Sequence, residues 1–167
     1  MISVISGENL KDDVLIISPK FITLYEQSKE SDWYWNSTSW KWGLQSYSSF
    51  NGNNISTFEL IDSLVSKLAN KDLFPQLTDI LLTGHSSGAA FVHMYSSTKF
   101  DNIYNNTNIH FSVVNNQYFL HPDSTRLLSN GSLSVLENCE VYNKWPYGLD
   151  DLSPYMERIG EENSRNN

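Results

Sequence analysis

The chain has 167 residues, 40% of them hydrophobic and 13% aromatic, which is enough apolar material for one domain with a packed core. Because 11 basic residues stand against 19 acidic ones, the net charge of −8 argues against nucleic acid or an anionic membrane as a partner. Cys139 is the only cysteine, which excludes an intrachain disulfide and a cysteine-based metal cluster. The first residues lack a signal-peptide pattern, no apolar run approaches the roughly 20 residues of a membrane span, and no metal-ligand or phosphate-loop spacing stands out. We therefore expect a soluble cytoplasmic protein with no metal and no cofactor.

The first element expected in chain order is a strand at residues 14–18, a continuous apolar run closed by Pro19. Such a run is typical of a strand buried on both faces of a parallel sheet. Residues 33–49 follow without a period and are rich in aromatic side chains, so we expect a long ordered loop. This loop either walls a substrate pocket with Trp40 and Trp42 or only covers an edge of the sheet.

A helix is expected after the turn at residues 51–54. Ser56 and Glu59 have the spacing of a capping box, in which each side chain bonds to the backbone of the other residue. The apolar residues that recur at the 3.6 period and predict its buried face, before an end near Asn70, are Phe58, Ile61, Val65 and Leu68. Residues 79–83 then predict a second strand, so the order strand, helix, strand indicates a right-handed crossover with both strands parallel.

The run Gly84-His85-Ser86-Ser87-Gly88 comes directly after this strand, and a helix-compatible run follows at residues 87–98. A Gly-x-Ser-x-Gly turn between a strand and a helix is the arrangement of a nucleophile elbow, in which the serine hydroxyl projects above the sheet. A side chain at Gly84 or Gly88 is expected to collide where the backbone folds back tightly. Ser86 is therefore the candidate nucleophile. The alternative is a turn whose glycines serve packing only and whose serine caps the helix.

The remaining elements complete an α/β fold. Residues 109–114 predict a third parallel strand, which gives a second crossover unit. Residues 126–140 show no clean period, and residues 152–159 predict a short helix with Pro154 in its first turn. We expect one domain over residues 1–160 and a polar, disordered tail over residues 161–167.

Several segments resemble a group of α/β-hydrolase-fold proteins of the serine hydrolase superfamily, both in order and in approximate spacing. These segments are residues 14–21, 40–43, 56–68, 81–95, 113–118 and 142–149. The most distinctive piece is Trp145-Pro146-Tyr147-Gly148, whereas the serine elbow is shared by the whole superfamily. The resemblance covers nearly the whole chain. It implies that residues 14–18, 79–83 and 109–114 are the fourth, fifth and sixth strands of the hydrolase sheet.

The resemblance also implies that the fold is truncated at both ends. The family has a third strand whose His-Gly turn supplies part of the oxyanion hole, and later strands that carry the catalytic acid and histidine; this chain contains neither. We therefore expect a partial α/β-hydrolase-like core with at least three parallel strands and flanking helices. Without the third strand, residues 14–18 either close up beside residues 79–83, which we favour, or leave uncovered edges that allow self-association.

An elbow serine needs a histidine base, and in the hydrolase fold the chain order is serine, acid, histidine. The histidines are His85, His93, His110 and His121. The first acid after the third strand is Asp123, and no histidine follows it, so that order is not met. His121 is the best-placed base, since the turn after a parallel strand lies on the same rim as the elbow. His85 is expected beside the serine in the pocket and not at its hydroxyl.

The acids that could orient His121 have simpler explanations. Asp123 is expected to be a turn residue. Asp150 and Asp151 are distant enough in sequence to orient the imidazole, but they are more simply caps of the helix that starts near Leu152.

The function that the resemblance implies is hydrolysis of a small-molecule ester, as in esterases and lipases. Ser86 would attack the carbonyl carbon, and the backbone N–H of Ser87 would form half of the oxyanion hole. Because the usual base is lacking, we expect this chain to be inactive or weak. The competing hypothesis is a non-catalytic relic or binding module, in which the tryptophan loop and the elbow rim form a pocket without turnover.

Overall fold

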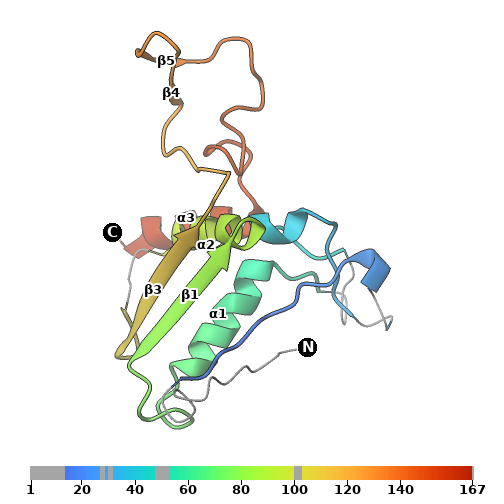
Figure 1. The fold of residues 1–167 in the computed structure, drawn as a ribbon, viewed down its shortest axis with the longest axis vertical. Helices are drawn as coiled ribbons and strands as arrows, with labels where there is room; N and C mark the ends of the chain where they lie inside the picture. Colours follow the sequence, from blue (N-terminus) through green and yellow to red (C-terminus); the bar gives the residue numbers. More distant parts are fainter. Residues whose placement is uncertain (1–13, 27–28, 30–31, 48–52, 100–102, 167) are drawn as a thin grey trace.

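The fold is a small sheet with its helices packed behind one face (Figure 1). The computed structural model describes residues 14–26, 29, 32–47, 53–99 and 103–166. The sheet has the order β1 (Asp79–His85), β3 (Thr107–Val114), β2 (Ile103–Tyr104); β1 runs parallel to β3, and β2 antiparallel to it. The helices are α1 (Thr57–Leu68), α2 (Ser87–Ser96) and α3 (Pro154–Asn166), with short 3₁₀ turns η1 (Leu24–Glu26) and η2 (Ser39–Trp42). The α/β fold class is thereby confirmed.

The core lies between this sheet and the helices. Ile80 pairs in register with Ile109, and Leu82 with Phe111, so these side chains share the face that packs against α2. Leu81, which points to the other face, is 61% exposed. The sheet is therefore covered on one face only within the described residues, and its strands alternate between buried and exposed positions.

Helix α1 forms as its sequence pattern predicts. Ser56 Oγ accepts a hydrogen bond from the backbone N–H of Phe58 at 3.0 Å, and the Glu59 carboxylate accepts one from the backbone N–H of Ser56 at 2.8 Å. Phe58, Ile61 and Val65 are buried in the core. The predicted capping box and apolar face are both confirmed: the box closes within the first turn of the helix, and the apolar face packs against α2, α3 and the sheet.

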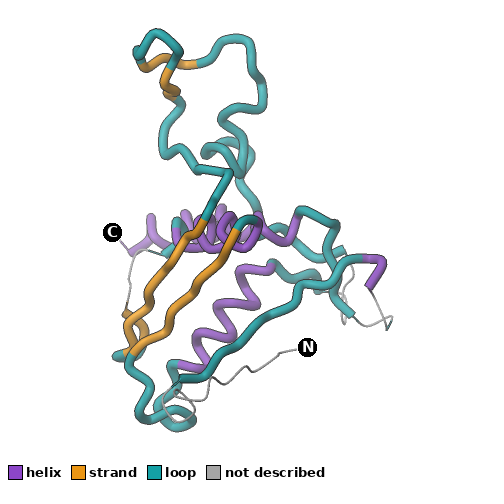
Figure 2. Tube along the Cα trace, viewed as in Figure 1, coloured by secondary structure: helices purple, strands orange, loops and turns teal. Residues whose placement is uncertain are grey.

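The predicted strand at residues 14–18 is wrong. These residues form no strand, and Val14, Leu15 and Ile16 are 45%, 50% and 40% exposed. Figures 1 and 2 show this segment outside the sheet. Direct closure beside β1 is therefore wrong too: β1 pairs only with β3 among the described residues, and the parallel strands number two and not three. Self-association through the uncovered edge of β1 stays a prediction.

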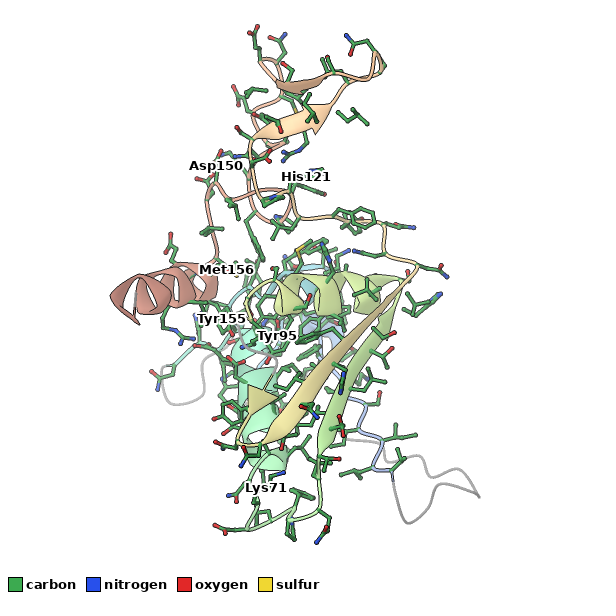
Figure 3. The ribbon with its side chains drawn as sticks, turned by 90° about the vertical axis from the view of Figure 1, so that its left-hand side faces the viewer. Lys71, Tyr95, His121, Asp150, Tyr155 and Met156 are labelled. Atoms are coloured by element: carbon green, nitrogen blue, oxygen red, sulfur yellow. The ribbon has the colours of Figure 1, made fainter. Side chains whose placement is uncertain are left out.

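Helix α3 is docked on the core by a shared carboxylate. Asp62 on α1 accepts a hydrogen bond from the Tyr95 hydroxyl of α2 and another from the Tyr155 hydroxyl of α3, both at 2.7 Å, and it pairs with the Lys99 ammonium. Figure 3 shows the two tyrosines lying together beneath α2. Burial, together with the nearby Asp62 charge, raises the pKa of both tyrosines, so both stay hydroxyl donors. The domain boundary expected near Gly160 falls inside α3.

A projecting arm rises from the carboxyl end of the sheet (Figures 1 and 2). It carries the hairpin of β4 (Thr125–Leu127) and β5 (Leu133–Val135), a stretch for which the sequence shows no period. Leu127 and Leu133 face each other across this hairpin, yet they are 72% and 69% exposed. None of the helices in the described part of the chain is long and apolar enough to cross a bilayer.

Candidate active site

Ser86 lies at the turn between β1 and α2, in a backbone conformation that few non-glycine residues adopt. Its φ is 55° and its ψ is −116°, and a residue held so far outside the common regions costs about 1–3 kcal/mol. The backbone N–H of Ser86 donates to the carbonyl of Val114 at 3.1 Å, and its own carbonyl accepts from the N–H of Ala90 at 3.0 Å. The strained turn is thus held on one side by β3 and on the other by the first turn of α2. The predicted strand–turn–helix is confirmed.

The Ser86 side chain does not cap the helix. Ser86 is exposed, and it makes no side-chain hydrogen bond to the first turn of α2. A capping serine normally has an extended backbone and accepts a bond from the second or third helical N–H. The alternative in which this serine is only a helix cap therefore does not fit its conformation.

The two glycines of the turn have different roles. A Cβ at Gly84 would lie 2.2 Å from the carbonyl oxygen of Gly88 and 2.7 Å from the backbone nitrogen of Ala89. That close approach of β1 to α2 requires glycine at position 84. A Cβ at Gly88 would meet nothing within 4 Å, so the expected collision at Gly88 is wrong.

The backbone N–H of Ser87 is available at the start of α2. The first amides of a helix have no intrahelical acceptor, and no acceptor for the Ser87 N–H is found within the described residues. Its N–H therefore stands next to the Ser86 hydroxyl at the positive end of the helix dipole. An oxyanion formed on a group attached to Ser86 would be stabilised in that position.

None of the four histidines bonds to the Ser86 hydroxyl in the part of the chain that the structure describes. His85 Nε2 lies 2.8 Å from the side-chain nitrogen of Asn115, which follows β3, so His85 flanks the turn as expected. His93 Nε2 accepts the backbone N–H of Leu120 at 3.1 Å, and burial lowers its pKa. It is a packing residue that holds the segment after β3 against α2.

His110 belongs to a pair at the opposite end of the sheet. Its Nε2 lies 2.8 Å from the Asp79 carboxylate, and this hydrogen bond is the main reason why the pKa of Asp79 falls to about 2. Asp79 begins β1, whereas Ser86 follows its end, so seven residues of extended chain, roughly 20 Å, separate the pair from the serine. This carboxylate–imidazole pair cannot serve Ser86.

His121 lies at the base of the arm. Figure 3 shows His121 and Asp150 on separate parts of the chain above the sheet. The backbone N–H of His121 donates to the Tyr147 carbonyl at 3.1 Å, and no described residue orients its ring by a hydrogen bond. The rearranged triad through His121 stays a prediction.

The downstream acids have local roles. Asp123 accepts hydrogen bonds from the Thr125 hydroxyl at 2.6 Å and from the backbone N–H of Thr125 at 2.7 Å, which lower its pKa and make it a turn residue as expected. Asp151 pairs with Lys144 at 2.7 Å. The cap of α3 is Ser153, whose Oγ accepts the N–H of Met156 at 3.3 Å, so the expected capping by Asp150 or Asp151 is wrong. Because α3 begins at Pro154, the capping position is the residue directly before it, Ser153.

The two tryptophans predicted to line a pocket pack in different places. Trp40 stacks on Phe21 and Phe91 with ring centroids 5.7 Å and 6.1 Å apart, so it is part of the core. Trp42 meets the edge of Tyr118 at 4.9 Å, and its carbonyl accepts the indole N–H of Trp145 at 2.9 Å. Only Trp42 therefore reaches the segment that follows β3, on the side where Ser86 lies.

Two polar residues near the rim escaped prediction. Asn115, with a φ of 54°, turns the chain after β3 and contacts His85. Lys41 is largely buried, and its Nζ lies over the rings of Trp42 and Tyr118, which contact each other. The signal for Asn115 was the Asn115-Asn116 pair at the end of a strand, since asparagine tolerates positive φ. The signal for Lys41 was its place between two tryptophans.

A hollow of about 390 Å³ lies at the other end of the sheet. Its lining consists of Ser66, Ala69, Asn70, Lys71, Asp72 and Asn105. These residues lie in the last turn of α1, directly after it, or just before β3, so the hollow opens near the amino ends of the strands. It is separate from the Ser86 turn.

Comparison with protein-family models, with curated proteins and with solved structures finds no match to this chain. The resemblance to α/β-hydrolase-fold proteins therefore stays an expectation that is carried by the segments of the sequence. The geometry of the Ser86 turn is independent of that resemblance.

Proposed function

We propose that this chain carries a serine-hydrolase site for ester bonds, with Ser86 as the nucleophile. The observation that carries this proposal is the strained conformation of an exposed serine between a strand and a helix. Such strain persists where the surrounding structure imposes it, and it clusters at functional sites. A serine that only linked two elements would have no need of it.

The proposed reaction begins with attack of Ser86 Oγ on the ester carbonyl carbon. The hydroxyl proton must pass to a base, while the carbonyl oxygen takes the negative charge of a tetrahedral intermediate. The Ser87 N–H then donates to that oxygen. Collapse expels the alcohol and leaves an acyl group on Ser86, which water removes in a second step.

We expect turnover by this chain to be weak. No histidine hydrogen-bonds to Ser86 within the described residues. Enzymes that lose triad members keep only about 10³ to 10⁴-fold acceleration over water. A comparable residual rate is the upper limit expected here.

A fluorophosphonate probe tests the nucleophile directly, because it forms a covalent bond only with an activated serine. We expect slow labelling at Ser86, identified by peptide mass spectrometry, and no labelling of Ser86→Ala. Ser87→Ala is the matched control, since its backbone N–H is unchanged. Labelling that is distributed over other serines, or that survives in Ser86→Ala, would contradict the proposal.

The second candidate function is a binding module without turnover. It is favoured by the finding that no histidine of the described residues hydrogen-bonds to Ser86, and by the cluster of Trp42, Tyr118 and Lys41 beside the same rim. Hydrolysis of p-nitrophenyl acetate separates the two candidates. A rate above the background that disappears in Ser86→Ala supports the hydrolase, and a further loss in His121→Ala would support the rearranged triad. A rate equal to that of Ser86→Ala supports the binding module.

A further inference from the structure

A hydrogen bond joins Asn115 and His85 at the rim of the Ser86 turn. The side-chain nitrogen Nδ2 of Asn115 lies 2.8 Å from Nε2 of His85. An asparagine amide nitrogen is a donor only, so Nε2 of His85 must accept this bond. A neutral imidazole that accepts at Nε2 carries its proton on Nδ1. The contact therefore selects one of the two neutral tautomers of His85.

The backbone at the end of β3 sets this contact. In the parallel register His85 lies opposite Val114, the residue directly before Asn115. The Val114 carbonyl also accepts the backbone N–H of Ser86 at 3.1 Å. Asn115 has a φ of 54°, a conformation in which asparagine is enriched, and it turns the chain where the strand ends. The same strand end therefore holds both the Ser86 backbone and the His85 ring.

This contact decides what His85 can do beside Ser86. With its Nε2 lone pair bonded to Asn115 and its proton on Nδ1, the ring has no free lone pair that could take the hydroxyl proton of Ser86. It has an N–H donor instead. Nδ1 is the ring nitrogen nearer to the backbone, and His85 is exposed and directly precedes Ser86. A substrate bound at the turn can therefore meet a hydrogen-bond donor from His85, but not a base.

We propose that Asn115 is a positioning residue, which fixes His85 as a neutral donor to an oxygen acceptor in the acyl part of an ester substrate. The role toward substrate rests on the proposed function, whereas the tautomer does not. The acyl group stays attached to Ser86 through both steps of the reaction, so it is the part of the substrate that lies beside the neighbouring residues. Ser87 follows Ser86 and would bind the carbonyl oxygen, which leaves the preceding His85 for a second oxygen.

Nitrogen NMR of isotope-labelled imidazole rings tests the tautomer in the unaltered protein. At about pH 9, above the ordinary imidazole pKa of about 6.5, the chemical shift of each ring nitrogen shows whether it carries a proton. We expect the His85 proton on Nδ1. His93 is a reference for the same tautomer, because its Nε2 accepts the Leu120 N–H, and His110 is a reference for the opposite one, because its Nε2 meets the Asp79 carboxylate. A His85 proton on Nε2 would overturn the proposal.

Two substitutions at position 115 separate the role of the amide from that of the turn. Asn115→Asp keeps the shape and tolerates positive φ, but it replaces the donor by an acceptor, so the His85 proton should move to Nε2. Asn115→Gly keeps the turn and removes the side chain, so His85 should lose its preference for Nδ1. His93 and His110 should keep their tautomers in both variants. An unchanged His85 tautomer in Asn115→Asp would show that Asn115 does not position the ring.

Hydrolysis of two matched esters tests the role toward substrate. p-Nitrophenyl methoxyacetate has an oxygen where p-nitrophenyl butyrate has a methylene group, and each rate is divided by the rate of the same ester without protein. We expect kcat/KM to favour methoxyacetate by about three- to tenfold, the effect of one ordinary hydrogen bond. In Asn115→Asp and Asn115→Gly this preference should disappear, chiefly through a higher KM, because a contact that is present before the reaction affects binding and not the chemical step.

The two measurements distinguish this inference from the proposed function. If Ser86→Ala hydrolyses both esters as fast as the unaltered protein, the proposed function fails and the substrate role of His85 fails with it, while the NMR spectra still decide the tautomer. If hydrolysis depends on Ser86 but the preference for methoxyacetate is absent, or persists in both variants of Asn115, the proposed function stands and this inference is wrong.

Discussion

Residues 14–18 and 79–83 are apolar runs of equal length that occupy different environments. In the second run Ile80 is 9% exposed and belongs to a strand that pairs with β3 along seven residues. In the first run the side chains are about half exposed, and no strand of the described residues pairs with it. The difference teaches that an apolar run becomes a strand only where a neighbour satisfies its backbone N–H and C=O groups. The second run has β3 beside it and α2 folded back over it, and the first has neither.

A substitution in the turn that folds α2 back over β1 should have the largest effect on stability. Gly84→Ala would place a methyl group 2.2 Å from a backbone oxygen, so β1 and α2 must separate. We expect a loss of at least about 3 kcal/mol in the free energy of unfolding, or failure to fold, because backbone atoms cannot yield as a flexible side chain does. Urea denaturation followed by circular dichroism measures this loss in the free energy of unfolding. Gly88→Ala is the matched control and should lie within about 1 kcal/mol of the unaltered protein.

A pair of isoleucine truncations compares the two runs directly. Ile80→Ala should lower the free energy of unfolding by about 2–5 kcal/mol, because it opens a cavity between the sheet and α2. Ile16→Ala should lower it by less than about 1.5 kcal/mol, since Ile16 is already 40% exposed. The same urea titration measures both. Equal losses for the two variants would mean that residues 14–18 are buried in solution and would refute the contrast.

The amino end of β1 gives the smallest expected effect. The hydrogen bond from His110 lowers the pKa of Asp79 from 3.8 to about 2 in the folded protein. A carboxyl group whose pKa is lower in the folded state stabilises it above the unfolded pKa, so this contribution is lost as the pH falls from about 4 to about 2. Asp79→Asn should therefore flatten the dependence of the midpoint of urea unfolding on pH in that window. Both side chains are exposed, so solvent keeps the effect small.

Asp72→Asn is the control for this titration, because it removes a carboxylate that lies outside the sheet. Between about pH 4 and pH 2, Asp72→Asn should change the pH dependence of the urea midpoint less than Asp79→Asn does. If the two variants behave alike, the Asp79–His110 contact does not contribute to the stability of β1.

Local sequence alone determined the features that arise from contacts within a few residues. The capping box of Ser56 and Glu59 is one, and the strand, turn and helix around Ser86 are another. In the capping box the bonded residues are at most three positions apart, and the Ser86 carbonyl accepts from Ala90 four positions on, so these partners lie within one short pattern. The N–H of Ser86, in contrast, is satisfied by Val114 of β3. The candidate nucleophile could be named for the same reason, although its chemical role remains a proposal.

Tertiary structure alone decided which segments meet. Residues 14–18 read as a strand because composition records how apolar a run is and not whether another strand lies beside it. Lys41 and Tyr118 are 77 positions apart in the sequence. The chain brings them together only through η2, α2 and the end of β3. The open space around Gly88 likewise depends on the direction in which α2 leaves the turn. Contacts between distant segments depend on the packing of the whole domain, and no short stretch of sequence contains both partners.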